Sequence, residues 1–113
     1  MECDVRDPER VQEYVDATID EFGGVDLLVN NAGGQFRAPF EEISENGWEA
    51  IVDLNLNSVR HTSHAAGDHM RENGGGDVIN FSSLRAQIPS WERTPYAASK
   101  AAIINFTENL ALE

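Results

Sequence analysis

Tyr96 and Lys100 are the two residues whose types and spacing could perform acid–base chemistry. They stand four positions apart, so on a helix both side chains project from one face. A free phenol has a pKa of ~10 and is therefore a poor acid–base group at neutral pH. A neighbouring ammonium favours the phenolate and makes a tyrosine usable as a proton donor and acceptor. Taken alone, such a pair is usually only an exposed helix pair.

Ser83 could act on the same substrate. It follows the apolar run DVINFS at 77–82, which predicts a buried strand. Open α/β sheets bind their ligands outside the carboxyl ends of the strands. The hydroxyl of Ser83 could therefore donate to a substrate oxygen as charge develops there. A serine in this place, considered by itself, is usually a turn former.

The hydrophobic pattern predicts the elements that must position these residues. In chain order they are the tail of a strand at 1–5, a helix at 8–22 capped by Asp7, a strand at 25–30, a long helical stretch from Ser44 to Gly74, a strand at 77–82 and a helix from Pro95 onward. Strands that alternate with connections of crossover length predict a parallel sheet covered on both faces. We therefore expect an α/β fold that is one domain or part of one.

Four short motifs lie in register along the chain: NNAG at 30–33, NLN at 55–57, FSS at 81–83 and YAASK at 96–100. Each alone is a weak signal. Together they resemble the short-chain dehydrogenase/reductase family of the classical type, and the resemblance covers nearly the whole chain. It implies a doubly wound, Rossmann-like parallel sheet and an oxidoreductase that uses NAD or NADP.

By this resemblance, Tyr96 is the catalytic acid–base residue and Ser83 polarises the substrate oxygen. Lys100 would hold the nicotinamide ribose hydroxyls and favour the phenolate of Tyr96. Asn55, at a kink in the long helix, would hold a water that relays protons to Lys100. Ser82 would be a structural neighbour, because the family's 13-residue step to the tyrosine starts at Ser83.

The resemblance also implies the residues that bind the cofactor. Tyr96 and Lys100 would contact its nicotinamide half. The backbone after the strand at 25–30 would line the adenosine side, where glycine allows a ligand to approach closely. An acid at the end of the strand at 1–5 would contact the adenine amine. The residues expected on the adenosine side are Asp4, Val5, Asn31, Ala32 and Gly33.

Parts of the family's domain are expected to lie outside this chain. The first two strands and the glycine-rich turn that binds the pyrophosphate would precede Asp4, and the later strands and the substrate-covering loop would follow Glu113. We therefore interpret residues 1–113 as a single incomplete Rossmann-like domain, truncated at both ends, whose strand at 1–5 has no neighbour. The choice between NAD and NADP and the substrate's identity stay open, because the deciding residues lie in those segments.

The composition is strongly acidic, with 20 acidic and 8 basic residues and a net charge of −12. Such a charge excludes nucleic acid as a partner, because its phosphates would be repelled. It indicates either a solvated acidic surface or adaptation to a high-salt cytoplasm, and the depletion of lysine favours the second. Lys100 is the one lysine retained, which indicates that an ammonium is needed there and a guanidinium is not equivalent.

Other features of the sequence bear on the cellular compartment and on the binding partners. A single cysteine, Cys3, cannot form an internal disulfide, which favours the cytoplasm. No apolar run approaches the ~20 residues of a membrane span, so we expect no membrane association. His61, His64 and His69 lie on the long helix, but no acidic or cysteine pattern completes a metal site. The family implies a homo-oligomer, a dimer or tetramer packed through its last two long helices.

We expect the complete protein to transfer a hydride between NAD(P)(H) and a carbonyl or secondary-alcohol carbon. An alternative is reduction of an enoyl thioester, because NNAGGQF followed by ISENGW is similar to the trans-2-enoyl-CoA reductase branch of the family. Ser83 and Tyr96 suit carbonyl chemistry better. An alternative of another class is an inactive fold member that binds a nucleotide or a partner, or a remnant without function.

The 113-residue chain made alone is predicted to bind nicotinamide cofactor weakly and to turn over nothing measurable, because the phosphate-binding turn is missing. The measurement is the absorbance of reduced cofactor with the purified chain. Detectable cofactor reduction would contradict the prediction.

Overall fold

Two short strands form a parallel sheet in the structure, a computed structural model that describes residues 1–113. β1 (Leu27–Asn30) pairs with β2 (Asp77–Asn80), residue for residue from one end to the other. Both strands have the aliphatic and β-branched residues that fit a pleated, half-buried surface. The two strands and their parallel pairing were predicted from the sequence and are confirmed, although each strand is shorter than expected.

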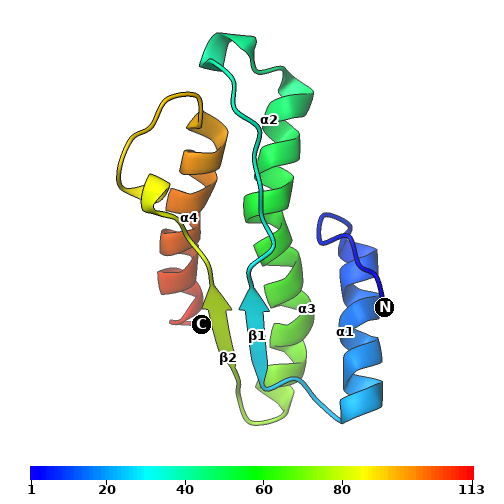
Figure 1. Cartoon of the computed structure of the whole chain (residues 1–113). Helices are drawn as coiled ribbons and strands as arrows, with labels where there is room; N and C mark the ends of the chain where they lie inside the picture. The colour runs from blue at the N-terminus through cyan, green and yellow to red at the C-terminus, as the bar shows by residue number, and fades with distance from the viewer.

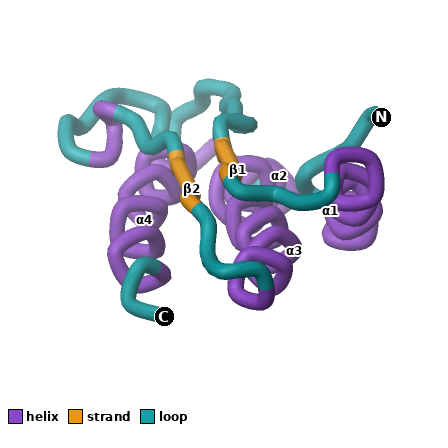
Figure 2. Tube along the Cα trace, turned by 90° about the horizontal axis from the view of Figure 1, so that it is seen from below, coloured by secondary structure: helices purple, strands orange, loops and turns teal.

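Four α-helices accompany the sheet. They are α1 (Pro8–Phe22), α2 (Glu45–Val52), α3 (Ser58–Glu72) and α4 (Thr94–Leu110). In Figure 1, α2 and α3 follow one another in a long column between α1 and α4. In Figure 2, α3 and α4 lie on one side of the two strands. None of the helices combines the length and the apolar character that crossing a membrane requires.

The opposite face of the sheet is uncovered in this chain. Val29 and Ile79 are directly paired and therefore point to the same face, and both are about half exposed. Leu27 and Phe81 are also half exposed. The sequence analysis predicted coverage on both faces, whereas the helices of this chain cover one. The reason is that the helices that follow β1 and β2 pack on the same side.

The start of the chain differs from the prediction. Residues 1–5 form no strand, because a strand needs a partner for its N–H and C=O groups and the sheet contains only β1 and β2. A turn follows, in which the Asp7 N–H donates to the Asp4 carbonyl at 3.1 Å. Asp7 then caps α1 as predicted, and Gly23 ends that helix with a positive φ of 85°.

The long helical stretch is interrupted where the resemblance to the family implied a kink. Residues Asp53–Asn57 form a π-helical turn (η2) between α2 and α3. Such turns place one extra residue in a helix and are frequent at functional sites. Asn55 is at the centre of this turn and has no exposed surface. The turn therefore directs a polar side chain into the interior.

Asparagines at the carboxyl ends of both strands join the sheet to the helices. Asn30 Nδ2 donates to Asn80 Oδ1 at 2.8 Å and to Ser63 Oγ of α3 at 3.3 Å. Thr62 Oγ1 donates to Asn30 Oδ1 at 2.6 Å. Asn80 Nδ2 donates to Thr107 Oγ1 of α4 at 2.9 Å. A row of side-chain hydrogen bonds thus runs from α3 through both strands to α4 and fixes where the strands end.

Asn30→Ala is predicted to lower the free energy of unfolding by about 2 kcal/mol, because buried partners lose their hydrogen bonds. Asn46→Ala is the matched control, since Asn46 is exposed in α2 and makes no side-chain hydrogen bond; its change should stay within about 0.5 kcal/mol. Denaturant unfolding of both variants measures the difference. Equal losses of unfolding free energy in the two variants would contradict the stabilising role of the hydrogen bonds of Asn30.

Candidate functional site

The predicted site residues gather where the two strands end. In Figure 1 both strands point toward the same end of the molecule, where the loops that follow them and the first turn of α4 meet. The loop after β1 contains Asn31, Ala32 and Gly33, all exposed. The segment after β2 contains Phe81 and Ser83. This is the edge at which open α/β sheets bind ligands.

Lys100 lies at the centre of this group and is only 5% exposed. Its Nζ donates to the Phe81 carbonyl at 2.9 Å and lies 5.9 Å from the centroid of the Tyr96 ring. An ammonium has three donors, and only this one has an acceptor within the chain. A methyl group added to Gly33 would stand 3.4 Å from the same Nζ. Lys100 therefore brings the Tyr96 ring, the end of β2 and the loop after β1 together.

Asn55 joins the π-helical turn to the loop after β1. Its Oδ1 accepts from the Gly34 N–H at 3.1 Å, and its Nδ2 donates to the Gly34 carbonyl at 2.6 Å and to the Ile51 carbonyl at 2.8 Å. The side-chain amide of Asn55 thus forms a pair of hydrogen bonds with the Gly34 backbone, as the backbone of a neighbouring strand would. These contacts give Asn55 a positioning role, while the predicted relay of protons through a water stays a prediction.

The two serines after β2 have different contacts. Ser83 precedes a short 3₁₀ turn, η3 (Leu84–Ala86), and its Oγ accepts from the Arg85 N–H at 3.2 Å. The Ser83 hydroxyl proton has no acceptor in the chain. Ser82 Oγ instead donates to the Lys100 carbonyl at 2.7 Å and joins the strand end to α4. Ser83 is thus the serine whose proton is available to a ligand.

Asp4 and Val5 lie on the other side of β1, toward α1. Asp4 is paired with Arg6, whose Nη2 lies 2.6 Å from a carboxylate oxygen, and this side-chain hydrogen bond lowers the pKa of Asp4 to about 2. The Val5 carbonyl lies 3.3 Å from Nδ1 of His61. A largely apolar groove of about 520 Å³ is lined by Val5 together with Asn31 and Ala32. The groove brings these three predicted cofactor residues together, whereas Asp4 does not line it.

The sequence analysis did not identify two residues of the site. Gly34 and Phe81 bind Asn55 and Lys100 through backbone atoms, so their side chains gave no sign of these contacts. The three histidines of α3 form no metal site, and no group of three His, Cys, Asp or Glu side chains is placed to hold an ion. His64 instead lies 4.0 Å from Asp68 on the same helix.

With this geometry in view, the whole chain, residues 1–113, matches the family model described as short chain dehydrogenase. The chain belongs to the short-chain dehydrogenase family. The resemblance carried by the four motifs of the sequence is therefore confirmed, as is the doubly wound fold class that it implied.

Three relatives illustrate the range of this short-chain dehydrogenase family. The D-threitol dehydrogenase of Mycolicibacterium smegmatis is 38% identical over 98% of this chain and 43% of its own length. The peroxisomal 2,4-dienoyl-CoA reductase of Arabidopsis thaliana is 36% identical over 100% of this chain and 41% of its own. A 7α-hydroxysteroid dehydrogenase solved with NADH and 7-oxo glycochenodeoxycholic acid has a TM-score of 0.92 and 34% identity, over 97% of this chain and 43% of its own. This short-chain dehydrogenase chain thus spans less than half the length of these relatives.

Gly33→Ala is predicted to destabilise this short-chain dehydrogenase by about 1–3 kcal/mol, because the added Cβ would stand 2.8 Å from the buried Oδ1 of Asn55. Gly67→Ala in α3 is the matched control: nothing lies within 4 Å of its added Cβ, so it should be neutral or stabilise by about 0.5–1 kcal/mol. Thermal and denaturant unfolding test the pair. A harmless Gly33→Ala would contradict the tight contact between Gly33 and Asn55.

Proposed function

We propose that this chain supplies the reacting residues of an NAD(P)-dependent oxidoreductase that acts on a carbonyl or secondary-alcohol carbon. The whole enzyme is this chain together with the parts that its longer relatives have in addition. The observation that carries the proposal is the buried ammonium of Lys100, 5.9 Å from the centroid of the Tyr96 ring. The Tyr96 hydroxyl is the group of this pair that can give a proton to a substrate oxygen or take one from it.

The chain offers a fitting place for a nicotinamide cofactor. The Gly33 backbone lies against Lys100 and Asn55 so closely that a Cβ there would meet them. The free donors of the Lys100 ammonium suit ribose hydroxyls, with Tyr96 beside them. Asn31 and Ala32 lie on the adenosine side of that point and share their groove with Val5. The half-exposed carboxylate of Asp4, which is paired with Arg6, would accept from an adenine amine.

When bound, the nicotinamide supplies a hydride to a carbonyl carbon or accepts one from a secondary-alcohol carbon. The residues of this chain act on the oxygen. In reduction, the Tyr96 hydroxyl gives its proton to the carbonyl oxygen, while the Ser83 hydroxyl donates a hydrogen bond to it. In oxidation, the Tyr96 phenolate takes the proton of the substrate hydroxyl. Lys100 stabilises that phenolate, and Asn55 holds the loop against which Lys100 lies.

A second candidate function is reduction of an enoyl thioester. Its support is the 36% identity to a peroxisomal 2,4-dienoyl-CoA reductase, together with the NNAGGQF segment at 30–36. The roles proposed for the Ser83 and Tyr96 hydroxyls, which both act on a carbonyl or alcohol oxygen, favour the carbonyl and alcohol reaction instead.

The proposal extends to the setting of the whole enzyme. We propose a homo-oligomer in the cytoplasm that acts on a small molecule. The exposed apolar residues of the sheet and of the end of α4 support an enzyme whose surfaces are covered by further parts or subunits, since large apolar patches are rarely left in water.

Tyr96→Phe in the whole enzyme is predicted to lower kcat by about a hundredfold or more, because general acid–base catalysis contributes a factor of this size. The ring remains, so cofactor affinity and thermal stability should change little. Tyr14→Phe removes the hydroxyl of the other tyrosine of this chain, which is on α1 and lines the apolar groove; because its ring is kept, kcat should stay unchanged. Initial rates of NAD(P)H formation or consumption distinguish the two. A Tyr96→Phe enzyme of near-normal activity would refute the assignment.

A further inference from the structure

The tripeptide Glu-Asn-Gly occurs twice in the chain, at 45–47 and at 72–74. An asparagine that precedes a glycine can lose its side-chain amide, because no side chain keeps the glycine nitrogen away from the asparagine side chain. Asn46 and Asn73, the two asparagines of these tripeptides, are both exposed. Since the reacting groups are the same in both places, the structure around them decides which asparagine reacts.

The reaction is an internal cyclisation followed by hydrolysis. The backbone nitrogen of the glycine attacks Cγ of the asparagine, so that a C–N bond forms and the Cγ–Nδ2 bond breaks. The side-chain nitrogen leaves as ammonia, with the proton that the glycine nitrogen has lost. Water then opens the cyclic imide at either carbonyl carbon and yields aspartate or isoaspartate. The reaction thus needs water, a free glycine N–H and an asparagine backbone that can turn toward it.

Asn46 does not meet these conditions. It lies in the first turn of α2, and the Gly47 N–H donates to Ser44 Oγ at 3.1 Å. A Cβ added to Gly47 would stand 2.9 Å from the Phe36 ring, so the glycine is enclosed on that side. Attack on Asn46 would break the cap and unwind the first turn of the helix.

Asn73 meets the same conditions. It follows the last residue of α3 and has left the helical conformation, with a φ of −115° and a ψ of 23°. The Gly74 N–H donates to no acceptor in the chain. Nothing lies within 4 Å of a Cβ added to Gly74 or to Gly75, and both glycines have a positive φ. The attacking nitrogen is therefore unbound and has room to move.

One contact opposes the reaction at Asn73. Its Nδ2 donates to the His69 carbonyl at 2.8 Å and lies 3.3 Å from Nδ1 of the same histidine. Both residues of this contact are at the surface of the helix end, where water replaces a lost hydrogen bond. Breaking it costs less than unwinding the first turn of α2, because no backbone hydrogen bond of a helix is lost with it.

We propose that Asn73 is a site of spontaneous deamidation, which converts it to aspartate and isoaspartate, while Asn46 keeps its amide. The proposal is independent of the reaction that the enzyme catalyses.

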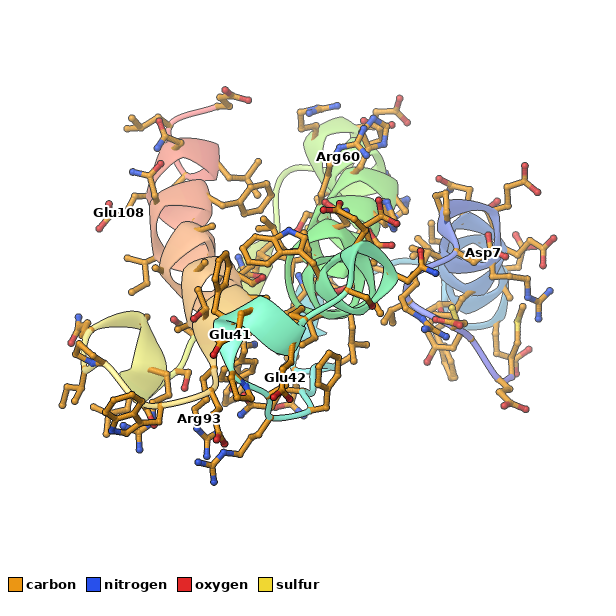
Figure 3. All side chains as sticks on the ribbon, turned by 90° about the horizontal axis from the view of Figure 1, so that it is seen from above. Asp7, Glu41, Glu42, Arg60, Arg93 and Glu108 are labelled. Carbon is orange, nitrogen blue, oxygen red and sulfur yellow. The ribbon has the colours of Figure 1, made fainter.

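The modification would act on stability and not on the reacting residues. Figure 1 shows the connection between α3 and β2 at the end of the molecule opposite the carboxyl ends of the strands. Figure 3 looks onto the other end, where Glu41, Glu42 and Arg93 lie. A carboxylate at position 73 would lose the bond to the His69 carbonyl and would face the negative end of the α3 dipole.

The test incubates the folded whole enzyme and follows both tripeptides by peptide mass spectrometry, with isoaspartate detected by an isoaspartate-specific methyltransferase. Asn73 should lose its amide at least about tenfold faster than Asn46, because unwinding a helical turn and breaking its cap add to the barrier at Asn46. In denaturant the two should react at similar rates. Equal rates in the folded enzyme, or an unreactive Asn73, would overturn the proposal.

Ser44→Ala tests the protection of Asn46 directly. It removes the acceptor of the Gly47 N–H and should raise the rate at Asn46 about fivefold, the factor that corresponds to the loss of a helix cap. The rate at Asn73 should stay the same. An unchanged rate at Asn46 would contradict the explanation by a bound glycine N–H.

Asn73→Asp imitates the acidic product and should lower the Tm by about 1–4 °C while kcat stays unchanged. Asn46→Asp is the matched control, since an acid in the first turn of α2 is favoured by the helix dipole and should not lower the Tm. Equal losses of Tm in the two variants would overturn the effect assigned to the modification.

Discussion

The burial of one ammonium group organises the site. Lys100 is 5% exposed, and a buried cation is costly unless acceptors surround it. The structure provides the Phe81 carbonyl, the face of the Tyr96 ring and a loop with no side chain at Gly33. Each of these partners must stay in place for the charge to remain buried. The end of β2, the first turn of α4 and the loop after β1 are therefore positioned relative to one another by a single group.

The π-helical turn has a place in the same arrangement. In an uninterrupted α-helix from α2 to α3, the side chain at position 55 would point in a different direction relative to the loop after β1. The turn buries Asn55, and its amide then provides both a donor and an acceptor for the backbone of Gly34. The loop would otherwise have unpaired backbone groups beside the ammonium. The irregular turn thus stabilises the loop that limits the space around Lys100.

Much of this could be predicted from side-chain pattern. The strand runs LLVN and DVIN and the Asp7 cap of α1 follow from local periodicity and residue type, and the resemblance to the family implied the interruption at Asn55. The prediction of a strand at 1–5 was wrong. A strand forms only where another strand pairs with it, and hydrophobic periodicity does not show whether such a partner is present. The roles of Gly34 and Phe81 were hidden, since they act through backbone atoms that every residue has. The Arg37–Glu92 ion pair was hidden as well, because it joins two loops whose approach depends on the whole fold.

The residues that hold the site together are different from those on the uncovered face of the sheet. The contacts of Lys100, Asn55 and Ser82 join β2, α4, the π-helical turn and the loop after β1, all within residues 31–100. Val29 and Ile79 on the uncovered face of the sheet take no part in them. Because covering that face would change none of these hydrogen bonds, the arrangement of Tyr96 and Lys100 belongs to this part of the chain. This part of the chain therefore determines how Lys100 lies against the Tyr96 ring, the Phe81 carbonyl and Gly33, whatever covers the open face of the sheet.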